Sequence, residues 1–176
     1  IFFFAYNWDE LSPFNKFGLL QCGLVLSLIA AIILRLETAA GQGMLIATSV
    51  FTGVLLAVIG QVYQTGADAW ELFAAWTVLT LPWALASRSS AHWMLWIVIC
   101  LTAVSFYGGQ VLVALGRLEA SELAVVTGVL PVVFLACREV VLRMGADWLD
   151  ESWFRRGLVL ISLGALFFPA LVYVFS

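Results

Sequence analysis

Long apolar runs separated by short polar connections constrain this chain more than any other feature. A helix needs about 20 apolar residues to cross a bilayer, and runs of roughly that length occur at 15–34, 41–59, 70–87, 93–115, 123–142 and 153–175. Hydrophobic residues make up 64% of the chain and charged residues 11%, a balance that leaves too few polar groups to cover a soluble domain. We therefore predict an all-α fold, a polytopic transmembrane helical bundle with about six full spans.

Residues 1–6 form a further apolar stretch that is too short to span. We interpret it as the tail of a partial first span whose start is missing. The expectation is a single transmembrane helical domain over 1–176, as a fragment that lacks an amino-terminal region. After this stretch, Ser12 followed by Pro13 is typical of a helix start.

The arginines and lysine predict an orientation, because short loops rich in these residues stay on the cytoplasmic side. One set of alternate connections contains Arg35, Arg88, Arg138, Arg143, Arg155 and Arg156, whereas the other contains only Lys16 and Arg117. We expect a multi-pass membrane protein. Its loops at 7–14, 60–70 and 116–122 lie outside, and those at 35–42, 88–92 and 143–153 are cytoplasmic.

Polar side chains on the predicted outer side are the candidate binding residues, because polar groups at membrane depth are costly unless they face protein, water or ligand. We expect them to bind a ligand or partner: Asn7, Trp8, Asp9, Glu10, Gln21, Gln61, Tyr63, Gln64, Asp68, Glu71 and Gln110. A purely structural interpretation also fits. Asp68 and Glu71 have the spacing of a capping box, and Gly66 suits a turn with positive φ.

Other polar residues favour structural roles. Glu139 and Arg143 have the spacing of an intrahelical pair, while arginines such as Arg138 extend their stems to the interface. The only histidine, His92, is expected in a surface loop, where it lacks the several ligands of a metal site.

Two further observations bear on cofactors and partners. Cys22, Cys100 and Cys137 lie in different spans with no metal-ligand spacing. The chain has no basic patch for nucleic acid. We predict no metal, no catalytic residues and no cofactor, with the lipid bilayer as the main partner.

Two motifs resemble a known family. The segment Phe2-Phe3-Phe4-Ala5-Tyr6-Asn7-Trp8-Asp9-Glu10-Leu11 is the first, and Gly60-Gln61-Val62-Tyr63-Gln64-Thr65-Gly66-Ala67-Asp68 with Leu81-Pro82-Trp83 is the second. Over residues 1 to 100 the chain is similar to the bacterial predicted membrane proteins of domain-of-unknown-function family 2157. The resemblance implies an inner-membrane protein and supplies no activity.

Three functions remain open on the sequence alone. The leading hypothesis is a nonenzymatic binding, sensing or scaffold bundle whose outer polar face docks another envelope membrane protein or a polar small molecule. The alternative is a small-molecule transporter, because Pro82 and Pro131 interrupt spans and free backbone carbonyls. The third is an intramembrane enzyme that uses Asp9, Glu10, Asp68 or Glu71 as acid and base.

Overall fold

Six long helices make up most of the part of the chain that the structure describes. The computed structural model describes residues 8 and 10–175, with side chains through residue 167. Its helices are α2 (Pro13–Ile33), α3 (Ala39–Tyr63), α4 (Ala69–Ser87), α5 (Ser90–Tyr107), α6 (Ala120–Arg143) and α7 (Ser152–Phe175), with a π-helical segment at Gly108–Val113 and a 3-10 turn at Asp147–Leu149. No strand occurs in this part of the chain, so the all-α prediction is confirmed.

Five segments have the length and apolar character needed to cross a membrane: Pro13–Ile33, Ala39–Tyr63, Ala69–Ser87, Ser90–Val113 and Ala120–Arg143. The sixth helix, α7, is 24 residues long. These helices match the predicted full spans, while the predicted partial span at 1–6 lies outside the described residues. Two connections are shorter than expected, because α3 continues to Tyr63 and α5 begins at Ser90.

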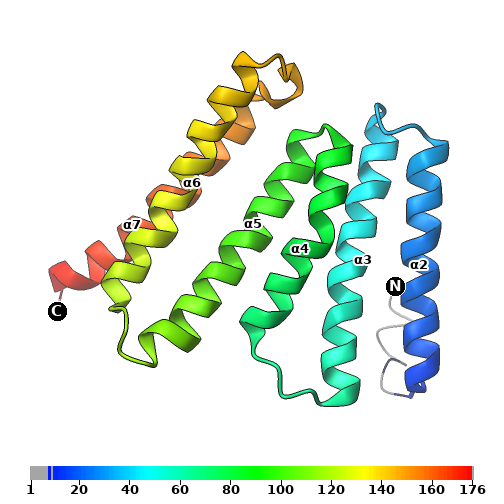
Figure 1. The fold of residues 1–176 in the computed structure, drawn as a ribbon, viewed down its shortest axis with the longest axis horizontal. Coiled ribbons are helices and arrows are strands. Elements are labelled where there is room, and N and C mark those ends of the chain that lie inside the picture. Colours follow the sequence, from blue (N-terminus) through cyan, green and yellow to red (C-terminus); the bar gives the residue numbers. More distant parts are fainter. Residues whose placement is uncertain (1–7, 9, 176) are drawn as a thin grey trace.

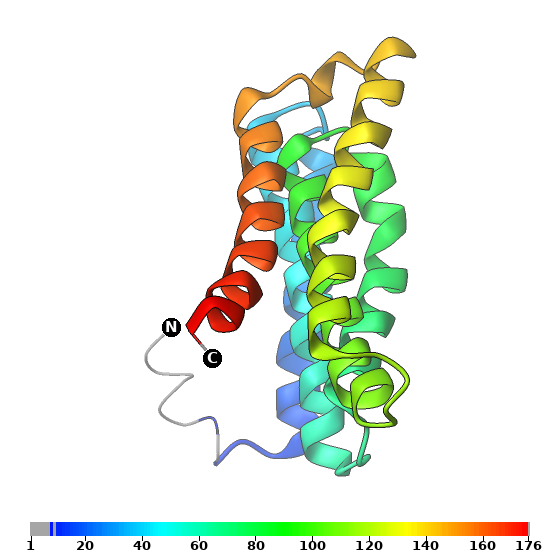
Figure 2. The same cartoon turned by 90° about the vertical axis from the view of Figure 1, so that its left-hand side faces the viewer.

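Consecutive helices run antiparallel and form three hairpins, α2–α3, α4–α5 and α6–α7 (Figures 1 and 2). The loops between the helices therefore gather at two opposite ends of the bundle. The first, which we call the acidic end, holds residues 8, 10–12, 64–68 and 114–119 with the adjoining helix termini. The second, the arginine end, holds residues 34–38, 88–89 and 144–151 with their adjoining termini.

Local sequence signals start several helices. The Ser12 hydroxyl accepts a hydrogen bond from the Asn15 amide at 3.3 Å, with Pro13 as the first helical residue, as predicted. The Thr38 hydroxyl accepts one from the Gly41 amide at 3.0 Å. At α6, the Glu119 amide donates to the Glu122 carboxylate at 2.8 Å, which is half of a capping box.

Buried hydroxyls and an indole join α2, α3 and α4. The hydroxyls of Ser27 in α2 and Thr48 in α3 lie 2.9 Å apart, and the Trp76 indole of α4 donates to the Ser49 carbonyl at 2.8 Å. Gly53 permits this approach, because a Cβ there would meet the Trp76 ring at 2.2 Å. Small residues and interhelical hydrogen bonds of this kind hold helices together where no hydrophobic force acts between them.

The expectation that His92 lies on a surface loop is wrong. His92 is in the first turn of α5 and is 1% exposed. Its Nε2 atom hydrogen-bonds the Ser49 hydroxyl at 2.8 Å. Because α5 begins earlier than its apolar run, the imidazole faces α3 and fastens these two helices together.

The predicted Glu139–Arg143 pair is also replaced by another arrangement. Arg138 is only 4% exposed, and its Nε atom donates to the Leu149 carbonyl at 2.9 Å. Its terminal nitrogens pair with Glu139 and with Asp150, the latter at 3.2 Å. The connection after α6 folds back over Arg138, which spacing along one helix does not reveal.

Candidate functional site

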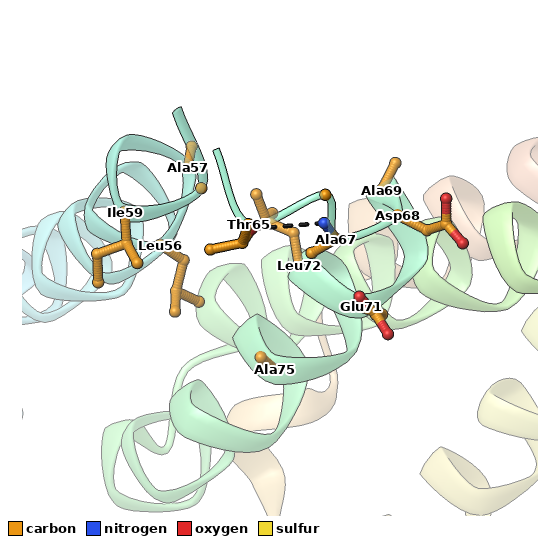
Figure 3. A pocket seen from close by; sticks show the side chains of 12 residues that line it. Leu56, Ala57, Ile59, Thr65, Ala67, Asp68, Ala69, Glu71, Leu72 and Ala75 are labelled. Carbon is orange, nitrogen blue, oxygen red and sulfur yellow. Dashed lines mark hydrogen bonds between the residues drawn. The ribbon is translucent and has the colours of Figure 1, made fainter. Parts of the chain in front are cut away.

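The connection between α3 and α4 encloses a hollow of about 390 Å³ at the acidic end. Its walls are mostly apolar, and its polar side chains come from the connection and the start of α4. Figure 3 shows Leu56 and Ile59 of α3 on one side of the hollow and Asp68 and Glu71 on the other. Leu72 and Ala75 complete the wall that α4 contributes. An apolar hollow with acid groups on one side is suited to a ligand that carries both an apolar body and a positive charge.

The backbone of this connection is shaped by left-handed residues. Gln64 ends α3 with φ +44°, and Gly66 follows with φ +66°, as the sequence predicts for this glycine. The Thr65 hydroxyl accepts a hydrogen bond from the Ala67 amide at 3.4 Å, the dashed line in Figure 3. The chain thereby turns within a few residues and brings Asp68 to the first position before α4.

The capping box predicted from Asp68 and Glu71 does not form. Asp68 occupies the cap position, but its side chain accepts no hydrogen bond from the first turn. Both carboxylates are exposed, and neither makes an ion pair with another described residue. A capping box therefore does not account for these two acids, and both exposed carboxylates lie beside the hollow.

Other predicted binding residues lie around this hollow without lining it. Gln61, Tyr63 and Gln64 are exposed at the end of α3, and the Tyr63 ring stacks on Phe17 of α2 with centroids 5.9 Å apart. The Gln110 side-chain oxygen accepts a hydrogen bond from the Trp70 amide at 3.3 Å. Gln110 therefore connects the π-helical segment after α5 to the start of α4.

The remaining predicted residues belong to the start of the chain. Trp8 lies beneath the Lys16 ammonium, which is 5.5 Å from the ring centroid. Glu10 and Gln21, the latter on α2, are exposed, and neither lines the hollow. Asn7 and Asp9 lie outside the described residues.

Acidic side chains outnumber basic ones at this end. The described carboxylates there are Glu10, Asp68, Glu71, Glu119 and Glu122, and the cations are Lys16 and Arg117. This imbalance produces a negative potential that attracts cations and repels anions. The apolar wall residues were not anticipated, because Leu56 and Leu72 resemble any other residues of a span.

Comparisons with known proteins define the family. The family described as Predicted membrane protein (DUF2157) matches residues 1–93, which is more than half of the chain. This stretch contains α2, α3, α4 and hence the whole α3–α4 hollow. Comparisons with curated proteins and with solved structures gave no match. The chain belongs to the DUF2157 family of predicted membrane proteins.

Proposed function

We propose that this protein is a nonenzymatic membrane bundle that binds an amphiphilic organic cation at its acidic end. The observation that carries the proposal is the pair of free carboxylates, Asp68 and Glu71, beside the apolar α3–α4 hollow. The apolar wall would accommodate the hydrophobic part of the ligand, and the carboxylates its charge. The hollow's volume of about 390 Å³ is within the range of small-molecule sites.

The proposed orientation of the bundle determines on which side of the membrane the hollow lies. Arginines gather at the opposite end of the helices, and arginine-rich short connections are retained on the cytoplasmic side. In this proposal the acidic end faces outward, so the hollow would bind cations that come from outside the cell or from the outer leaflet. The protein would then act as a receptor for such compounds.

Charge removal at the hollow tests the proposal. The probe is tetraphenylphosphonium, a soluble cation with an apolar surface, and its binding to the purified protein in detergent is measured by equilibrium dialysis. Asp68→Asn and Glu71→Gln should each weaken binding by roughly fivefold, because an exposed charge contact contributes about 1 kcal/mol. The double variant should lose more than either single variant.

Glu10→Gln is the matched control, because it removes the same charge at the same end without touching the hollow. Its affinity for the cation should stay close to that of the unmodified protein. Equal losses for Glu10→Gln and Glu71→Gln would show a general surface-charge effect and contradict the proposed site. Equal binding of uncharged triphenylphosphine oxide would contradict the role of the carboxylates.

A further inference from the structure

The three hairpin connections at the arginine end meet around a second hollow region. One hollow of about 300 Å³ and another of about 580 Å³ share Gln42, Arg88 and Trp148 as lining residues. Gln42 comes from the start of α3, Arg88 from the α4–α5 turn and Trp148 from the α6–α7 connection. We call this region, defined by these three residues, the three-loop groove.

Buried serines hold the α4–α5 turn in place. Ser87, Ser89 and Ser90 are all buried, and the Ser89 amide donates to the Ser87 hydroxyl at 3.3 Å. The Ser90 hydroxyl donates to the Trp148 carbonyl, which ties the turn to the third hairpin. Because these contacts fix the backbone on both sides of Arg88, the guanidinium is presented from a rigid turn.

Arg88 has a left-handed backbone, and it makes no ion pair with another described residue. Its φ is +45°, a left-handed conformation that residues other than glycine adopt at a cost of about 1 kcal/mol. The ion pairs of the described chain do not include Arg88. Its side chain is exposed, so the guanidinium is available to an anionic group in the groove.

Carboxylates flank Arg88 on both sides. Glu37 lines the larger hollow and Glu151 the smaller one. Glu37 has a partner in Arg35, at 3.7 Å, in a solvent-exposed pair, whereas Glu151 makes no ion pair with a described residue. A purely anionic ligand would be repelled by these carboxylates, but a zwitterion would satisfy both signs of charge.

The surroundings of the groove match the headgroup level of a bilayer. Trp148 and Trp153 line it, and tryptophan rings favour this depth. At the same end of the bundle, Ile33, the last residue of α2, is 73% exposed and Leu85 of α4 is 61% exposed. Apolar surface suited to acyl chains is thus exposed on helices at this end.

We propose that the three-loop groove binds a zwitterionic phosphate–ammonium headgroup. The phosphate lies against Arg88 and the Gln42 amide, because a guanidinium recognises phosphate oxygens in a two-pronged geometry. The primary ammonium lies against Glu151. This site is at the opposite end of the bundle from the α3–α4 hollow, so its occupancy does not depend on the proposed cation site.

Native mass spectrometry of the full chain in mild detergent tests the site. The probes are phosphatidylethanolamine and phosphatidylglycerol with identical acyl chains, added in equal amounts. The protein should retain the ethanolamine lipid preferentially. Arg88→Gln should weaken its retention about tenfold, the effect of losing one charge-assisted hydrogen bond, and Glu151→Gln should remove the preference over phosphatidylglycerol.

Two control variants change similar charges at the same end outside the groove, namely Arg143→Gln and Asp147→Asn. Both should retain the lipid as the unmodified protein does. Free phosphoethanolamine distinguishes the source of the headgroup chemistry: failure to displace the lipid supports a bilayer lipid, and displacement at equal concentration supports a soluble zwitterion in the same site. Equal retention of the two lipids, or an equal loss in Arg143→Gln, would overturn the proposal.

Discussion

Replacing Gly41 by alanine is expected to destabilise the fold by about 2–4 kcal/mol. A Cβ at this position would lie 2.1 Å from the Arg35 carbonyl oxygen, and that atom belongs to the backbone rather than to a flexible side chain. The same carbonyl accepts hydrogen bonds from the Thr38 amide and hydroxyl. Overpacking alone costs about 1–3 kcal/mol, and displacing the α2–α3 connection weakens these hydrogen bonds as well.

Gly43→Ala is the matched control, because this glycine is in the same helix and a Cβ there meets nothing within 4 Å. It should raise stability by about 0.5–1 kcal/mol, since alanine restricts the unfolded chain more than glycine does. Urea unfolding of both variants in mixed micelles, followed by circular dichroism, measures the difference. Two variants of equal stability would show that the α2–α3 connection does not approach Gly41 this closely.

Arg138→Met is the second substitution with a large expected effect, a loss of about 2–3 kcal/mol. The Leu149 carbonyl loses its charged donor, and hydrogen bonds to charged groups contribute about 1.5–3 kcal/mol. The loss of Asp150 as a partner adds less, because the Asp150 side chain is 78% exposed. Unfolding should begin in the α6–α7 connection, which faster amide hydrogen exchange over residues 145–151 would detect.

Arg143→Met provides the comparison, because Arg143 is exposed in the last turn of the same helix and makes no ion pair with a described residue. Its stability should change by less than about 0.5 kcal/mol. If Arg143→Met destabilised the protein as much as Arg138→Met, the pair expected from helical spacing alone would be correct and the buried arrangement of Arg138 wrong.

The spans were predictable because lipid imposes a simple rule on them: every backbone polar group must be bonded within the helix, and the side chains must be apolar over a fixed length. Helix starts at Ser12 and the turn at Gly66 followed from equally local rules. The predicted positions of the helix ends were less accurate. Gly60–Gln61–Val62 has the composition of a turn, yet α3 continues through it to Tyr63.

Contacts between distant segments were not predictable from one sequence. His92 contacts Ser49 because two hairpins pack against each other, and Arg138 contacts Leu149 because the α6–α7 connection folds back over α6. The same holds for the candidate sites. Asp68 was identified from its polarity. The apolar wall beside it and the groove around Arg88 are formed by residues from separate segments, and the sequence around those residues gives no local signal of a site.

We propose that the acidic end faces outward and the arginine end inward, on opposite sides of one membrane. Single cysteines at Thr65 and Asp147, in a protein whose Cys22, Cys100 and Cys137 are replaced by alanine, place one reporter at each end. A membrane-impermeant maleimide applied to intact spheroplasts should label Thr65→Cys at once and Asp147→Cys only after permeabilisation. Labelling of both cysteines from outside, or of Asp147→Cys alone, would contradict this orientation.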